Sequence, residues 1–280
     1  MLPMMMSPPS SDRLASVKPA SASPTYYLLS RREKYVWGLK PSPWQRHTFK
    51  ALCQELGIPV PNGLSHQPPD LSHHASMVDD CRSDDNSLCH DMLTTLGFTH
   101  EQMHRAAERF RLGRSRSGQP IYWMIDDMGR CLDGHIGDAW VSAMLKARCP
   151  ELAPYLTVTH CLFGLHQTSL NDTKAIGIVE SERSAVLLSE LCPELLWLAY
   201  AYPTNMTIDQ FEPLQGRQVT FYPRTDPTKD IYVSFLEMAD LVRRAYRSID
   251  ISVSPFLEDN ATDSQKQRHI DLVDYLFDTL

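Results

Sequence analysis

The sequence predicts an α/β fold in which a mostly parallel sheet carries helices on both faces. From Lys174 onward, apolar strand-like runs alternate with amphipathic helical patterns, which is the order expected of βαβ units. The run at residues 175–179 shows no polar alternation, so we expect a strand that is covered on both faces. A helix over residues 182–191 follows at once and must end before Pro193.

The remaining elements after Lys174 are predicted from the spacing of apolar residues that is typical of strands and of helices. They are strands at residues 195–201, 218–222 and 249–253, a short helix at 208–214, a helix at 234–247 and a last helix at 270–280. Together they assign residues 171–280 to one α/β domain.

Residues 86–170 are expected to form a smaller α+β subdomain. Asn86 or Ser87 can cap a helix that Gly97 ends, and Thr99 with Gln102 fits a capping box for a second helix. These two helices predict a helical hairpin. A β-hairpin should follow, with strands at residues 121–125 and 131–136.

Residues 1–85 are expected to be a largely disordered or linker region. The first 25 residues are rich in Pro, Ser, Ala and Met without periodicity. Within this region the apolar spacing from Trp44 to Leu56 predicts a short helix near residues 44–56.

Composition narrows the class of protein. A net charge of -7 argues against a generally basic nucleic-acid binder, so contact with a polyanion must use local patches. The seven cysteines contain no C-x-x-C spacing, which favours reduced thiols over a zinc ribbon or a disulfide frame. No stretch has the length of a membrane span, and the first residues lack the pattern of an export signal. We therefore expect a cytoplasmic protein that has no membrane partner.

Two acidic residues lie where strands of the predicted sheet end. Glu180 follows the strand at 175–179, and ligands of open α/β sheets bind outside the carboxyl ends of the strands. Glu180 is therefore a candidate catalytic residue. The alternative is a carboxylate that only caps or faces the positive end of the helix at 182–191. Asp226 follows the strand at 218–222, where a turn residue before Pro227 is the alternative.

Basic residues gather in one short segment and around the predicted sheet. Four arginines fall within eight residues beside small and flexible residues, which suits contact with phosphates. A solvated loop is the alternative. The candidate phosphate-binding residues are Arg109, Arg111, Arg114, Arg116, Arg130, Lys174, Arg183 and Arg224.

Four segments carry a resemblance to a known family. They read IYWMIDDMGRCLDGHIG, THCLFGLHQT, AIGIVESERSAVLLSEL and QVTFYPRTDPT, in this order. Residues 174–280 resemble a toprim domain, the catalytic fold of bacterial primases, topoisomerases and related nucleases. Residues 87–280 resemble a bacterial toprim-like family of unknown function that is encoded on mobile elements beside replication and mobilisation genes. The resemblance implies DNA or RNA and replication or mobilisation proteins as partners, and Mg²⁺ as the cofactor.

The resemblance also assigns roles residue by residue. Glu180 matches the catalytic acid or base, and Asp226, aided by Asp230, matches the side chains that hold Mg²⁺. Arg224 stands where the family has its first aspartate, and a guanidinium cannot bind a metal ion. The metal site is thus degenerate, and Arg224 is expected to pair with Glu180 or Asp226.

Three functional hypotheses remain open from the sequence. The first is a primase-like protein of a mobile element with a degenerate site for Mg²⁺-dependent phosphotransfer. The second is a non-catalytic module in which Arg224 creates an anion pocket and the arginine-rich loop holds DNA or RNA. The third is a scaffold that binds a partner protein through the carboxyl-terminal amphipathic helix.

Overall fold

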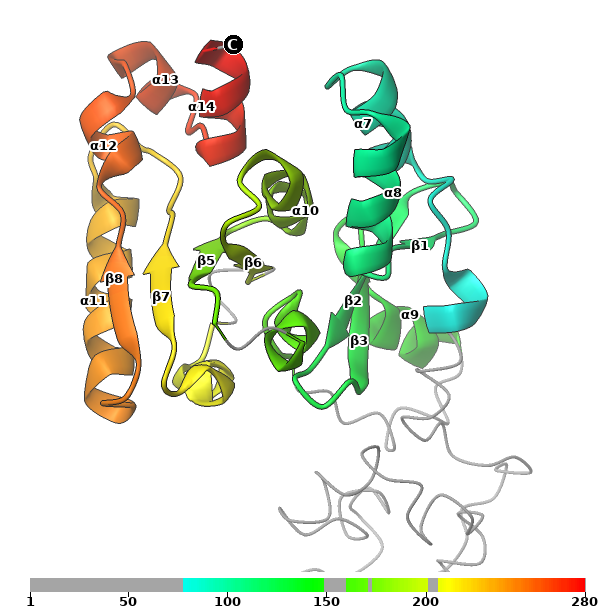
Figure 1. Ribbon diagram of the computed structural model, residues 1–280, viewed down its shortest axis with the longest axis horizontal. Helices are drawn as coiled ribbons and strands as arrows, with labels where there is room; N and C mark the ends of the chain where they lie inside the picture. Colours follow the sequence, from blue (N-terminus) through cyan, green and yellow to red (C-terminus); the bar gives the residue numbers. More distant parts are fainter. Residues whose placement is uncertain (1–77, 149–159, 171–172, 201–205, 280) are drawn as a thin grey trace, which may run out of the picture.

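The structure is a computed structural model that describes residues 78–148, 160–170, 173–200 and 206–279 (Figure 1). Within these ranges it has the predicted α/β architecture: a four-stranded parallel sheet flanked by helices, preceded by an antiparallel sheet and a pair of helices. Almost all of the N-terminal region expected to be disordered, including the short helix near 44–56, falls outside the described residues.

The predicted helical hairpin is confirmed as α7 (Ser87–Thr94) and α8 (His100–Arg109). Asn86 caps α7 by accepting the backbone N–H of Cys89 at 3.1 Å. Thr99 begins α8 with the predicted capping box. Gly97 lies between the helices with a φ of 72°, a conformation that glycine adopts without strain.

The antiparallel sheet contains the predicted β-hairpin and two short strands beside it. The strands pair in chain order, and α9 (Val141–Arg148) then packs against β3. Their bounds are β1 (Gly113–Arg114), β2 (Pro120–Ile125), β3 (Cys131–Ile136) and β4 (Ala139–Trp140).

The parallel sheet has the strand order β6-β5-β7-β8, with every neighbouring pair parallel. α10 connects the first two strands with the predicted bounds, and α11 connects the last two. The elements are β5 (Ile176–Val179), α10 (Glu182–Leu191), β6 (Leu196–Ala199), η4 (Ile208–Leu214), β7 (Gln218–Phe221), α11 (Asp230–Ala245) and β8 (Asp250–Val253).

Both faces of this sheet are buried, as the unbroken apolar run of β5 predicts. On one face Val179 and Trp197 pack with side chains of α7, α8 and α10. On the other face Ile178 and Phe221 pack with side chains of η4 and α11. Gly177 lies under the Trp197 ring, where a Cβ atom would come within 2.5 Å of the indole. The sequence of β5 therefore needs a residue without a side chain at this position.

The carboxyl-terminal part differs from the expectation in two ways. α11 begins at Asp230, one turn before the predicted start at residue 234. The chain after β8 forms three helices instead of one: α12 (Phe256–Asn260), α13 (Asp263–Gln267) and α14 (Leu272–Thr279). Figure 1 shows these helices above the carboxyl ends of β7 and β8, with α14 near α10.

The small subdomain and the parallel sheet share one core. Phe163 lies just before η2 (Leu165–Ser169) and exchanges two backbone hydrogen bonds with Ala199 of β6, at 2.7 and 3.1 Å. Its ring stacks on Phe110 at a centroid distance of 5.0 Å. These contacts hold the two sheets in a fixed relation, and that relation positions the site described next.

Candidate functional site

The strand order creates a switch point at the carboxyl ends of β5 and β7. β6 lies on one side of β5 and β7 on the other, so the connections that leave β5 and β7 diverge to opposite sides. Ligands of open α/β sheets bind at such points. Glu180 follows β5 directly, and Arg224 lies three residues beyond the end of β7. The structure thus brings together two residues that the sequence singles out.

Glu180 and Arg224 make two contacts. The backbone N–H of Arg224 donates to Glu180 Oε1 at 3.1 Å, and Arg224 Nε lies 3.3 Å from Glu180 Oε2. The Glu180 side chain is 14% exposed and that of Arg224 is 46% exposed. Burial raises the pKa of Glu180, and Arg224 opposes this increase. The expected pairing of Arg224 with Glu180 is therefore present.

Tyr200 follows β6 and places a polar group in the same region. The residue is 2% exposed, and its hydroxyl interacts with the Glu180 carboxylate. Burial and then the charge of Glu180 raise the pKa of Tyr200. The hydroxyl therefore lies within electrostatic reach of the Glu180 carboxylate.

Asp271 is a second carboxylate near Glu180, and the sequence analysis missed it. Its negative charge contributes to the raised pKa of Glu180, after the larger effect of burial. Ser184 of α10 donates its hydroxyl to Asp271 Oδ2, and the backbone N–H of Asp274 donates to Asp271 Oδ1 at 2.9 Å. The signal available in the sequence was the Asp-x-x-Asp spacing at residues 271–274, which is typical of two side chains that cap the start of a helix.

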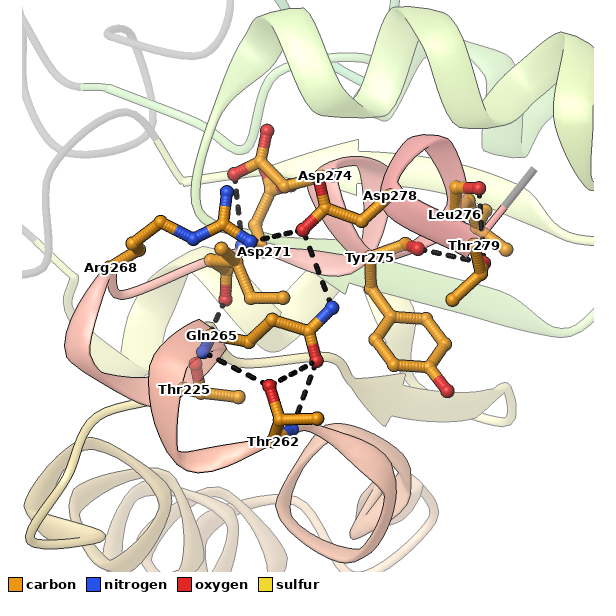
Figure 2. Close-up of polar contacts among 11 residues, drawn as sticks. Thr225, Thr262, Gln265, Arg268, Asp271, Asp274, Tyr275, Leu276, Asp278 and Thr279 are labelled. Atoms are coloured by element: carbon orange, nitrogen blue, oxygen red, sulfur yellow. Dashed lines mark hydrogen bonds and ion pairs between the residues drawn. The ribbon is translucent and has the colours of Figure 1, made fainter.

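The segment that carries Asp271 is fixed to the loop after β7. Thr225 donates its backbone N–H to the carbonyl oxygen of Ile270 at 2.9 Å. Figure 2 shows this contact beside the network in which Gln265 and Arg268 both bind Asp278. The residue next to Arg224 is thus bonded to the residue next to Asp271.

Asp226, the predicted metal ligand, accepts hydrogen bonds from the backbone at the start of α11. Its Oδ2 accepts the backbone N–H of Thr228 at 3.2 Å and of Asp230 at 3.0 Å, and its Oδ1 accepts that of Ile231 at 3.1 Å. Burial acts to raise the pKa of Asp226, but these hydrogen bonds and that of the Thr228 hydroxyl outweigh it, and the pKa is lowered. The buried carboxylate caps α11, which explains the early start of this helix.

Replacing Asp226 with alanine is expected to lower the free energy of unfolding by about 1–2 kcal/mol, because the first N–H groups of α11 lose their acceptor. Asp230 is exposed and lies in the first turn of the same helix, so its replacement with alanine should cost less than about 1 kcal/mol. Urea unfolding of both variants measures the difference. Equal stability of the two variants would contradict the capping role.

Several of the predicted basic residues lie away from the switch point. Arg109 binds Glu190 at 3.0 Å and the carbonyl oxygen of Ser189 at 2.9 Å, near the end of α10 that is remote from Glu180. Lys174 precedes β5 and donates to the carbonyl oxygen of Pro193, at the amino edge of the sheet. Arg130 is largely buried and pairs with Asp126 at 2.5 Å.

The arginine-rich loop forms a separate surface around β1. Arg114 and Arg116 are exposed, and Arg114 Nε lies 3.5 Å from Asp85. Arg111 is half-buried and has a positive φ of 50°. Arg183, in contrast, lies on the first turn of α10. The positive charge of Arg183 acts on Asp274: burial and then the charge of Asp271 raise the pKa of Asp274, and Arg183 opposes this increase.

A second polar cluster links the antiparallel sheet to α10. His135 Nδ1 lies 2.8 Å from Glu182 Oε1, and both side chains are buried. The His135 ring packs against Trp140, which stacks on His160 at 3.8 Å between centroids. His160 Nε2 in turn lies 3.0 Å from the buried Asp133. This cluster fixes the start of α10 two residues after Glu180.

The described residues contain no group of three or more His, Cys, Asp or Glu side chains arranged to hold a metal ion. Asp226 and Asp230, the metal ligands predicted from the sequence, are not part of such a group among the described residues. In the part of the chain that the structure describes, no helix has the length and apolar character needed to cross a membrane.

Comparison with solved structures gives distant similarities in fold. The DnaG catalytic core has 14% identity and a TM-score of 0.43, over 75% of this chain and 83% of that chain. A DnaG primase catalytic domain bound to ssDNA has 14% identity and a TM-score of 0.41, over 75% and 84%. The zinc-binding and RNA polymerase domains of Aquifex aeolicus primase have 13% identity and a TM-score of 0.43, over 85% and 71%.

Comparison with curated proteins gives no match. Comparison with protein families gives one that spans half of the chain and includes both Glu180 and Arg224. Residues 86–225 match the domain of unknown function DUF6371, and the chain belongs to this family.

Proposed function

We propose that this protein is a primase-like, toprim-related protein that binds DNA or RNA, and that Arg224 contacts phosphate at the carboxyl edge of the parallel sheet. The family resemblance of the four sequence segments suggests a role in the replication or mobilisation of a mobile element. The observation that carries the proposal is the pairing of Glu180 with Arg224 at the switch point.

The geometry of Arg224 suits contact with phosphate. Its backbone is fixed by the hydrogen bond to Glu180, while its side chain remains 46% exposed. A guanidinium presents several N–H donors in a planar fork that matches two phosphate oxygens. The site therefore offers a positioned positive charge where a toprim enzyme has an acidic residue.

We do not propose that this site catalyses phosphotransfer. Asp226 uses both carboxylate oxygens to cap α11, and Arg224 places a positive charge on Glu180. Binding without chemistry, the second hypothesis from the sequence, fits this arrangement better than catalysis. The exposed Arg114 and Arg116 offer a second surface for the same polyanion.

The experiment is fluorescence anisotropy with labelled DNA and RNA oligonucleotides at low salt. Wild type should bind, and Arg224→Ala should bind more weakly for every sequence tested, because a phosphate contact carries no sequence information. Arg244→Ala is the matched control, since Arg244 is an exposed arginine in the last turn of α11. Absence of binding by wild type, or equal losses in the two variants, would overturn the proposal.

A further inference from the structure

We propose that Glu180 is an internal competitor for Arg224: nucleic acid binds at the switch point when a phosphate replaces the Glu180 carboxylate as the partner of the Arg224 guanidinium. The inference rests on the proposed function and adds how the affinity of that site is set. It gives the glutamate that matches the catalytic acid or base of toprim enzymes a role in limiting the binding of nucleic acid.

The two contacts between Glu180 and Arg224 differ in kind. The backbone N–H of Arg224 donates to Glu180 Oε1 at 3.1 Å, and this bond does not depend on the position of the guanidinium. The guanidinium approaches Glu180 Oε2 through Nε at 3.3 Å. Ion pairs that solvent reaches are weak, because water competes for both partners. The guanidinium can therefore leave Glu180 while the loop after β7 keeps its position.

The two side chains are unequally exposed, and this decides which of them moves. The Arg224 side chain is 46% exposed and can rotate toward a ligand in solvent, whereas Glu180 is 14% exposed and stays at the end of β5. A carboxylate that loses its positive partner in a poorly solvated place is destabilised. This destabilisation opposes the exchange, so Glu180 lowers the affinity of Arg224 for phosphate.

The opposite role for Glu180 would be to aim Arg224 at its ligand. A carboxylate that binds a guanidinium through Nε leaves the two terminal nitrogen atoms for a phosphate, and its removal would then weaken binding. Such aiming requires a short and well-aligned hydrogen bond of about 2.8 Å. The separation of 3.3 Å and the exposure of Arg224 favour competition instead.

Protonation of Glu180 should relieve the competition. Burial raises the pKa of Glu180, and the backbone N–H and the charge of Arg224 oppose this increase. When the guanidinium moves to a phosphate, its opposing charge is removed, so Glu180 binds a proton more readily in the complex. By linkage, the affinity for nucleic acid should rise as the pH falls. The charged and titratable groups around Glu180 are Arg224 after β7, Tyr200 after β6, Asp271 before α14, and Glu182 and Arg183 at the start of α10.

The test is the affinity of the full-length protein for labelled DNA and RNA oligonucleotides, measured by fluorescence anisotropy at low salt. Glu180→Gln keeps an oxygen that can accept the backbone N–H of Arg224 but removes the competing charge. It should bind about threefold more tightly than wild type, the size of an ion pair between partly exposed side chains. Glu237→Gln, the same change at an exposed position of α11, is the matched control and should gain less. In the Arg224→Ala background, Glu180→Gln should also gain less, because the competition needs Arg224.

A second measurement leaves Glu180 unchanged and so does not depend on the folding of its variant. Between about pH 7 and about pH 5, the affinity of wild type should rise more than that of Arg224→Ala. Circular dichroism checks that each variant is folded.

Three results would overturn the inference and leave the proposed function intact. They are equal or weaker binding by Glu180→Gln than by wild type, an equal gain from Glu237→Gln, and the same pH dependence in wild type and Arg224→Ala. Absence of binding by wild type and by Glu180→Gln alike would contradict the proposed function itself.

Discussion

Replacing Asp133 with alanine is expected to lower the free energy of unfolding by about 3 kcal/mol, because four donors lose a buried charged acceptor. The Asp133 side chain is 0% exposed and accepts the N–H of Gly134 at 2.7 Å and of Ser142 at 3.0 Å. It also binds the Ser142 hydroxyl and His160. Urea unfolding at neutral pH measures the loss, and Ser142→Ala, which removes one side-chain donor, should cost only about 1 kcal/mol.

The pH dependence of a second variant, Asp133→Asn, tests the cause of this loss. Burial acts to raise the pKa of Asp133, but the hydrogen bonds from His160, Ser142 and Gly134 outweigh it, and the pKa is lowered in the folded state. A lowered pKa stabilises the fold above the unfolded value of about 3.9, and the stabilisation is lost as the pH falls through the folded value. The difference between wild type and Asp133→Asn should therefore be constant from neutral pH down to about pH 5 and then shrink. A difference that stays constant into strong acid would contradict this account.

Replacing Phe163 with alanine is expected to lower the free energy of unfolding by about 4 kcal/mol, the range for a fully buried phenylalanine. The ring is 0% exposed, stacks on Phe110 and meets Tyr122 edge to face. It lies between the helical hairpin and the parallel sheet, so the cavity would open at the joint between the two parts.

Two optical probes follow this joint during unfolding. Of the five tryptophans that contribute to the fluorescence, Trp123 and Trp197 are buried in different sheets, and far-ultraviolet circular dichroism reports on the backbone. In wild type the two transitions should coincide, because the sheets share a core. In Phe163→Ala the midpoint should fall. An unchanged midpoint would show that the Phe163 ring does not join the two parts.

Local patterns were sufficient to predict the elements around Glu180. The apolar run of β5 is buried on both faces, α10 has its predicted bounds, and Thr99 forms its predicted capping box. Each of these features depends on neighbours within a few residues. The pairing of Glu180 with Arg224 was also predictable, because both residues follow strands that end at the same edge of the sheet.

The other members of the site depend on contacts that are distant in the sequence. Asp271 reaches α10 only because two short helices, α12 and α13, return the chain to the carboxyl edge of the sheet, and its bond to Ser184 spans 87 residues. The role of Asp226 was ambiguous from the sequence, because a strand-end aspartate and a helix-capping aspartate share the same pattern. Asp133 lies in the segment IYWMIDDMGRCLDGHIG, but its partner His160 lies 27 residues further along the chain. A local sequence pattern therefore could not predict their contact.

The salt dependence of nucleic-acid affinity tests directly whether Arg224 contacts phosphate at the switch point. For a single strand, each neutralised phosphate adds about 0.7 to the slope of log affinity against log salt concentration. Arg224→Ala is expected to lower this slope by about 0.7 relative to wild type, whereas Arg244→Ala should leave it unchanged. An Arg224→Ala protein with the wild-type slope and affinity would contradict this contact.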